Sequence, residues 1–244
     1  MIVLNDKFKN LYASKTRYYS IIGGRGSAKS FAVATFLLQL TFEPNRKIFF
    51  SRLTMTSAYK SIIPSVSGKI GLLGLEKFFH VTQTEIINKM TGSSIEFSGL
   101  KSSSGQFTAA NKSLEDYSDW VLDEAEEMID ENMFDMIDLS FRRANTKLRV
   151  IMIMNQPTEE HFLYKRFFES VGVDQFFNGI KGDTTYICMN YLDNLKNLSP
   201  SFIAACERIK KDNPDKYYHT VLGAFRKKAE GVIFTNWHYG EFNH

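Results

Sequence analysis

Eight consecutive residues bring together three glycines, a lysine and a serine hydroxyl: Gly23, Gly24, Arg25, Gly26, Ser27, Ala28, Lys29 and Ser30. A glycine-rich turn can direct its backbone N–H groups at phosphate oxygens, and the positive end of a following helix strengthens the attraction. In such a loop the lysine reaches the β- and γ-phosphates, and the hydroxyl that follows it binds Mg²⁺. The stretch therefore predicts a phosphate-binding loop, with a simple strand-to-helix turn as the alternative.

The usual pattern of such loops has a glycine where this chain has Ala28. Glycine is required only where φ is positive or where the backbone must approach another group very closely. A methyl group at this position is therefore compatible with the loop if the φ of Ala28 is negative.

Two acids, Asp123 and Glu124, follow the apolar run 120–122. Open α/β sheets bind their ligands at the carboxyl ends of the strands. We expect Asp123 to hold Mg²⁺ through water and Glu124 to orient or deprotonate the attacking water. An acidic helix start is the alternative, but the upstream loop favours the hydrolytic pair. The next acids are predicted to lie on a solvated helix face: Glu126, Glu127 and Asp130.

Asn155 follows a further apolar run, 148–154. Its side chain lies beside the loop and the acidic pair if the three strands are neighbours. Asn155 is then a candidate sensor of the γ-phosphate, with a turn residue at a strand exit as the alternative.

Strand and helix signals alternate along the chain, which predicts a parallel sheet covered by helices on both faces. The expected fold is an α/β three-layer sandwich of the P-loop NTPase class (RecA-like, ASCE), with an added antiparallel hairpin around residues 91–93. A mobile loop is expected at 101–105. The predicted strands are 18–22, 46–52, 85–88, 94–97, 148–154 and 184–190, and the predicted helices are 31–40, 54–70 (interrupted by Pro64), 131–141, 161–169, 200–211 and 214–222.

The composition, 244 residues of which 43% are hydrophobic, fits one large domain. Charge breaks the N-terminus too early for a secretory signal, and no apolar run approaches the ~20 residues of a membrane span. Cys188 and Cys206 support neither a disulfide framework nor a zinc site. The net charge of +3 does not establish nucleic-acid binding. Three basic clusters are candidate phosphate contacts or solvated faces: Arg142 and Arg143 with Lys147 and Arg149; Lys210 and Lys211; and 226–228.

Five ordered blocks together resemble the large terminase subunit of tailed bacteriophages, and the resemblance covers nearly the whole chain. The blocks are 23–30, 120–127, 155–157 followed by 161–168, 191–194, and 229–237. The resemblance implies an ATPase that uses ATP and Mg²⁺ to drive double-stranded DNA into a procapsid, in the host cell cytoplasm and away from membranes. It further implies an ATPase domain over 1–231. Residues 232–244 would begin a linker toward a C-terminal nuclease domain, so we expect no nuclease activity from this chain.

By the same resemblance, Arg25 matches the arginine that stabilises transition-state charge, a role worth ~10³–10⁵ in rate. Arg142 or Arg143, offered to a neighbouring subunit, is the alternative. Asn155 matches the motif that couples hydrolysis to movement. The implied partners are the portal protein, the small terminase subunit and further copies of this chain. The copies are expected to form a ring on the procapsid and to be monomeric in solution.

Two other functions share the nucleotide site. A helicase-like translocase would differ from a packaging motor by separating strands. A nucleotide-gated binding module would hydrolyse little ATP. Glu124 argues against this function, because a protein that only binds nucleotide needs no second carboxylate beside the metal-binding Asp123.

Overall fold

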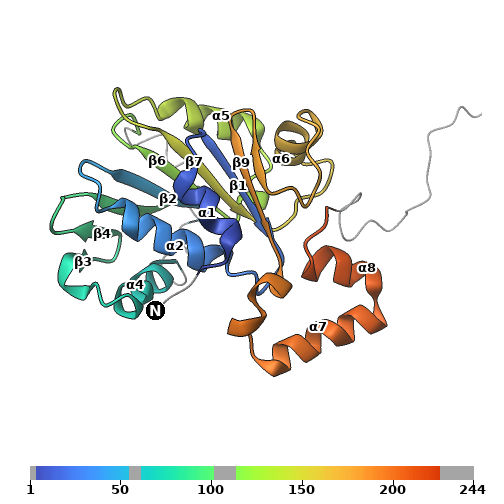
Figure 1. Cartoon of the computed structure of the whole chain (residues 1–244). Helices are drawn as coiled ribbons and strands as arrows, with labels where there is room; N and C mark the ends of the chain where they lie inside the picture. The colour runs from blue at the N-terminus through green and yellow to red at the C-terminus, as the bar shows by residue number, and fades with distance from the viewer. Residues whose placement is uncertain (1–3, 55–61, 102–113, 226–244) are drawn as a thin grey trace, which may run out of the picture.

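The computed structural model describes residues 4–54, 62–101 and 114–225 (Figure 1). A nine-stranded sheet in the order β3-β4-β5-β2-β6-β7-β1-β9-β8 forms its centre. The six strands from β5 to β9 in this order are parallel, and β3, β4 and β8 add antiparallel pairs at the edges. The strands are β1 Tyr18–Gly23, β2 Lys47–Thr54, β3 Phe79–Val81, β4 Glu85–Asn88, β5 Ser94–Lys101, β6 Asp119–Asp123, β7 Arg149–Met154, β8 Gly179–Lys181 and β9 Thr184–Met189.

Helices cover both faces of this sheet. The α-helices are α1 Lys9–Ala13, α2 Lys29–Leu40, α4 Ile63–Leu72, α5 Glu131–Ser140, α6 Phe162–Tyr164, α7 Pro200–Asp212 and α8 Pro214–Lys216. Shorter helical turns are η1 Asp6–Phe8, η3 Glu76–Phe78, η5 Ala125–Glu127, η6 Lys165–Glu169, η7 Tyr191–Asn197 and η8 Tyr217–Val221. Within the described ranges, no helix is both long and apolar enough to cross a membrane.

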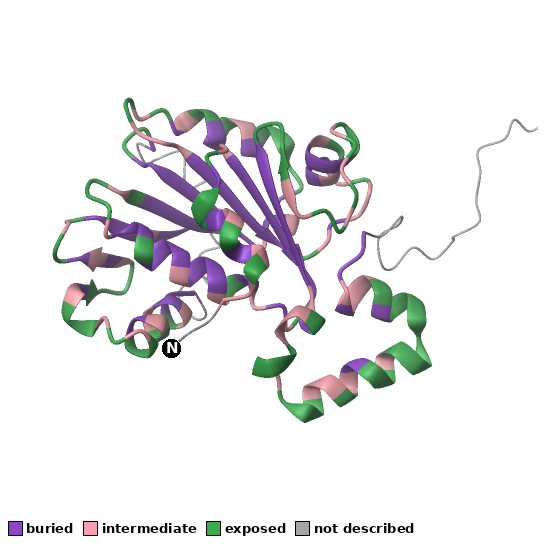
Figure 2. Cartoon of the chain, viewed as in Figure 1, coloured by how far each residue is buried: buried purple, intermediate pink, exposed green. Residues whose placement is uncertain are grey.

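The central strands are buried on both faces, as Figure 2 shows in purple. Successive residues of β7 alternate between two hydrophobic layers: Ile151 and Ile153 pack in the layer of α2 and α4, and Val150 and Met152 in the layer of α5. A parallel sheet needs this cover because both of its faces are apolar. The predicted three-layer α/β sandwich is thereby confirmed.

The sequence placed most elements correctly. The predicted hairpin is confirmed as β4 and β5, with Ile86 opposite Ile95, and β3 extends it. The predicted interruption at Pro64 was wrong: Pro64 lies in the first turn of α4, which begins at Ile63, where the missing N–H of proline costs no helical hydrogen bond. Three predictions fall wholly or partly outside the described residues: the first part of the helix predicted over 54–70 (55–61), most of the mobile loop (102–105) and the last terminase-like block (229–237).

Residues 191–222 form a separate helical extension from η7 to η8, which follows the carboxyl end of β9 (Figure 1). Its small core contains Tyr191, Cys206, Tyr217 and Val221. Ser199 caps α7 by accepting a hydrogen bond from the backbone N–H of Phe202. The extension lies at the carboxyl ends of the parallel strands, where the predicted site residues emerge.

Candidate functional site

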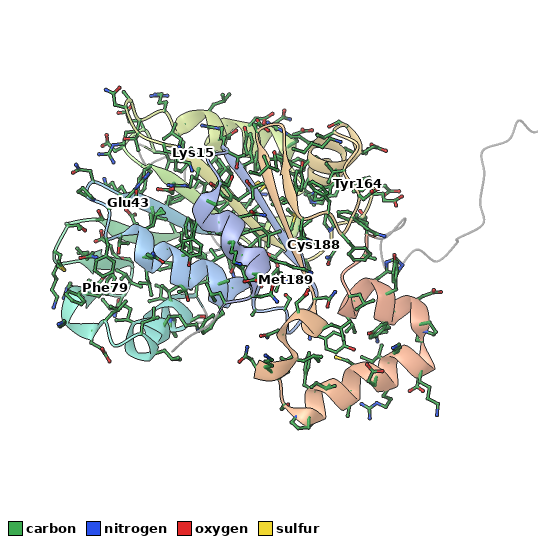
Figure 3. The ribbon with its side chains drawn as sticks, viewed as in Figure 1. Lys15, Glu43, Phe79, Tyr164, Cys188 and Met189 are labelled. Atoms are coloured by element: carbon green, nitrogen blue, oxygen red, sulfur yellow. The ribbon has the colours of Figure 1, made fainter. Side chains whose placement is uncertain are left out.

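The glycine-rich loop joins β1 to α2, and β1 lies between β7 and β9 in the sheet. A Cβ at Gly23 would collide with the carbonyl oxygen of Met189, the last residue of β9 (labelled in Figure 3). A Cβ at Gly24 would collide with the carbonyl oxygen of Val221 in the helical extension. Both glycines are therefore required for close backbone approach, and the loop is packed between the sheet and the extension.

Ala28 does not have the negative φ that would let a methyl group fit the loop without strain. Its φ is +63°, in the left-handed region, and it caps the N-terminus of α2 without a side-chain hydrogen bond. A left-handed conformation costs a residue with a Cβ about 1–2 kcal/mol. The condition under which a methyl group fits without strain, a negative φ, is therefore not met, and Ala28 carries the strain of the left-handed conformation.

Lys29 is buried, with 9% of its surface exposed. Its Nζ donates to three groups of its own loop: the carbonyl oxygens of Gly23 and Gly24 and the Oγ of Ser27. Burial lowers the pKa of Lys29 to about 8, against the opposing charges of Glu126 and Asp123. The ammonium is thus held by neutral dipoles, and an anionic phosphate would be a stronger partner.

Asp123 and Glu124 emerge at the carboxyl end of β6, as predicted. Asp123 is 5% exposed and accepts hydrogen bonds from Nε of Arg52 at 2.8 Å and from its Nη2 at 2.6 Å. Glu124 has a φ of +54° and lies 3.3 Å from Nη1 of Arg52. Burial raises the pKa of Glu124, an effect that Arg52 opposes.

Arg52 was missed by the sequence analysis. It lies near the end of β2, which pairs with β6 in the sheet, and it is 71 residues from Asp123 in the chain. The signal that could have found it is a charged residue at the end of an apolar strand. Its relevance depends on strand order, which the sequence did not provide.

Ser30 and Asp123 both line a cavity of about 180 Å³ between α2, β2, β6 and α4. Ser30 is exposed at the start of α2. A serine hydroxyl and a carboxylate are oxygen donors of the kind that Mg²⁺ prefers. Their chemistry fits a magnesium ion.

Asn155 follows β7, which lies between β1 and β6, so it emerges between the loop and the acidic pair. Its Nδ2 donates to Oε1 of Glu126 at 2.7 Å, and its Oδ1 lies 3.5 Å from Nζ of Lys29. The three sequence motifs therefore meet at one edge of the sheet.

Glu126 corrects a prediction. It was expected on a solvated face, but the left-handed Glu124 and the turn η5 bring its half-buried carboxylate back to Asn155. Burial raises the pKa of Glu126, and the backbone N–H groups of Glu126 and Asn155 and the charge of Lys29 oppose the rise. Of the other two acids, Glu127 is exposed and Asp130 caps α5.

The candidate arginine fingers lie apart from one another. Arg25 is exposed on the loop itself. Arg142 pairs with Glu115 at 2.9 Å. Arg143 donates to the carbonyl oxygen of Asn45, which precedes β2 and so lies at the opposite edge of the sheet. Of these three candidate arginines, Arg25 is the one that lies in the phosphate-binding loop of its own chain.

The basic clusters differ in exposure. Arg149 is buried and pairs with Asp119 at 2.8 Å, and Lys147 donates to the carbonyl oxygen of Ser14. Arg149 is thus withdrawn from the surface, whereas Lys147 is half-buried with its Nζ directed at the chain's own backbone. Lys210 and Lys211 are both exposed near the end of α7, and residues 226–228 lie outside the described residues.

A larger cavity of about 1140 Å³ lies between the loop, the N-terminal segment and the helical extension. Gly26, Ala28 and Phe31 line one side, and residues 192–197 of the extension line another. Asn194 donates from Nδ2 to the carbonyl oxygen of Gly26 at 2.8 Å. The cavity is continuous with the loop and large enough for a nucleoside.

Known proteins share this fold. The large terminase of the thermophilic bacteriophage D6E matches with a TM-score of 0.68 at 11% identity, covering 92% of this chain and 53% of that one. The HK97 bacteriophage large terminase matches with a TM-score of 0.62 at 17% identity, covering 91% and 50%. The ATPase domain of the Thermus phage P74-26 large terminase matches with a TM-score of 0.62 at 15% identity, covering 91% and 94%.

The chain thus spans about half the length of the D6E and HK97 proteins. The D6E large terminase has also been solved in complex with ATP-gamma-S, and that structure matches with a TM-score of 0.66 at 11% identity. No curated protein matches the chain. A family model described as phage terminase large subunit matches residues 15–224. The chain therefore belongs to the phage terminase large subunit family.

Proposed function

We propose that this chain is a magnesium-dependent ATPase that drives viral double-stranded DNA into a procapsid. The observation that carries the proposal is the meeting of Lys29, Asp123 and Asn155 at the ends of three neighbouring strands, β1, β6 and β7. Phosphoryl transfer to water uses a lysine on the phosphates, an acid that holds the metal ion and polar groups that position the reactants, and such groups meet here at the carboxyl ends of adjacent strands.

In this mechanism the loop binds the phosphates, and Lys29 exchanges its carbonyl partners for the β- and γ-phosphate oxygens. Ser30, and Asp123 through water, would hold Mg²⁺, which would supply charge neutralisation at the phosphates. Glu124 orients or deprotonates the attacking water. Arg25 stabilises the charge of the transition state within the same subunit.

The nucleoside would enter the cavity of about 1140 Å³ beside Gly26 and Ala28. The similarly folded D6E large terminase has been solved with ATP-gamma-S, which supports nucleotide binding by this fold. Because Asn194 bonds to the loop at Gly26, nucleotide in this cavity would contact the loop and the helical extension together.

The motor as a whole needs more than this chain. We propose residues 1–231 as the ATPase domain, with 232–244 leading toward a nuclease domain, since the chain spans about half of the D6E protein. Double-stranded DNA, the portal protein and the small terminase subunit are the proposed partners in the host cytoplasm. The chain would be monomeric in solution and would form a ring on the procapsid.

Phosphate release and calorimetric ATP binding test the proposal. Lys29→Ala removes the ammonium group that would contact the transferring phosphate and is expected to lose both binding and turnover. Glu124→Gln leaves the binding groups in place, so it is expected to bind ATP and to lose about 10²-fold or more in turnover. Glu127→Gln is the matched control at an exposed glutamate. ATP binding by Lys29→Ala at wild-type affinity would contradict the loop assignment.

A duplex-unwinding assay separates a packaging motor from a helicase-like translocase. We expect ATP-driven movement of duplex DNA, with portal and procapsid present, without release of single strands. Strand separation would contradict the packaging function while leaving the ATPase assignment intact.

A further inference from the structure

Glu126 lies at this site although it belongs neither to the phosphate-binding loop nor to the acidic pair Asp123 and Glu124. Its Oε1 accepts a 2.7 Å hydrogen bond from Nδ2 of Asn155. Its Oε2 is buried and lacks a hydrogen-bond partner among the described residues. A carboxylate held half-buried in this way costs free energy relative to a solvated one, so its position calls for a compensating role.

The contact fixes the orientation of the Asn155 amide. With Nδ2 directed at Glu126, Oδ1 faces Nζ of Lys29 at 3.5 Å. The opposite orientation would set the Oδ1 acceptor against a carboxylate and the Nδ2 donor against an ammonium group, and both contacts would be repulsive. Glu126 therefore favours, together with Lys29, the orientation in which Oδ1 of Asn155 faces the lysine.

We propose that Glu126 is a positioning residue for ATP hydrolysis, which acts by holding Asn155 with its acceptor atom Oδ1 turned toward the ammonium group of Lys29. This inference rests on the ATPase function proposed above. Glu124 lies against Arg52, whereas Glu126 lies against Asn155, so the two glutamates of the acidic block serve different sides of the site.

The test compares steady-state kinetics of four variants. Glu126→Ala is expected to lower kcat about tenfold with little change in KM, because the hydrogen bond is made to an ionised group and serves the reaction more than binding. Asn155→Ala should lose a similar factor. The double variant should lose no more than either single one, because both changes remove the same arrangement. Glu126→Gln keeps an acceptor oxygen and should recover part of the loss.

The control is Glu127→Ala, which removes the neighbouring exposed glutamate and should leave kcat and the unfolding temperature unchanged. Wild-type turnover by Glu126→Ala would overturn the inference, and so would losses that multiply in the double variant. Absence of hydrolysis by the wild-type chain under all conditions would instead refute the proposed function.

A second measurement does not depend on hydrolysis. The side-chain amide resonance of Asn155, assigned with Asn155→Ala, should shift in Glu126→Ala and in Glu126→Gln but not in Glu127→Ala. An Asn155 amide resonance that is the same in the wild type and in both Glu126 variants would overturn the inference, even if a kinetic variant failed to fold.

Discussion

Lys29 makes nucleotide affinity depend on pH in a direction that the structure determines. Burial lowers the pKa of Lys29 to about 8 in the nucleotide-free protein, and the phosphates would raise it again by adding opposite charge. Binding therefore requires the protonated lysine, and affinity falls as pH rises through the nucleotide-free pKa. This is the reverse of a carboxylate site, which strengthens its hold on cations as pH rises.

The magnitude follows from the protonated fraction. With a pKa of about 8, this fraction is roughly 0.8 at pH 7.5 and roughly 0.03 at pH 9.5. Apparent affinity scales with the binding-competent fraction, so Kd should rise about 25-fold between these values. The phosphates of the nucleotide are ionised throughout this range.

Calorimetry of ATP-gamma-S binding at fixed Mg²⁺ measures both Kd and proton uptake, if two buffers of different ionisation enthalpy are used. We expect uptake of about one proton at pH 9.5 and much less at pH 7.5. Lys29→Arg stays protonated over this range and should bind more weakly but without the pH dependence. The thiol of Cys188, whose pKa burial raises to about 11, does not titrate in this window. A Kd that stays constant from pH 7.5 to 9.5 would refute the argument.

Two further predictions concern stability. Ala28→Gly should raise the free energy of unfolding by about 1 kcal/mol, or about 2–4 °C in Tm, because it relieves a positive φ. The control Ala204→Gly, at an exposed position of α7, should lower the free energy of unfolding by a similar amount. Equal effects of the two changes in thermal unfolding would argue against strain at Ala28. Arg52→Ala should lower the free energy of unfolding by about 3 kcal/mol, because it leaves the buried Asp123 without its bidentate partner. Mg²⁺ should then raise the Tm of this variant more than that of the wild type, and equal shifts would contradict a shared site.

The sequence predicted the strands that carry the site because those strands are apolar on both faces. Such runs, bounded by glycine or by polar residues, are recognisable without any knowledge of the fold. Tyr18–Gly23 and Arg149–Met154 were found in this way, and each is followed by its predicted site residue. The neighbouring positions of β1, β6 and β7 then brought Lys29 and Asn155 together.

The parts that the sequence missed depend on strand order and on local backbone conformation. Arg52 meets Asp123 only because β2 pairs with β6. Glu126 turns back to the site because Glu124 adopts a positive φ, a conformation that the residue type does not favour. Ala28 adopts a positive φ for the same reason of site geometry. Each miss lies where tertiary structure overrides a local preference, at the site itself.

The sheet order also explains why an amide follows β7. Because β7 lies between β1 and β6, the residue after it faces a lysine on one side and a glutamate on the other. Asparagine has one acceptor and one donor group, and here Oδ1 faces Lys29 while Nδ2 binds Glu126. An aspartate would repel Glu126, and a lysine would repel Lys29. The amide is the group that satisfies both neighbours without adding charge, so the charge that a γ-phosphate brings is left to be balanced by Lys29 and the metal.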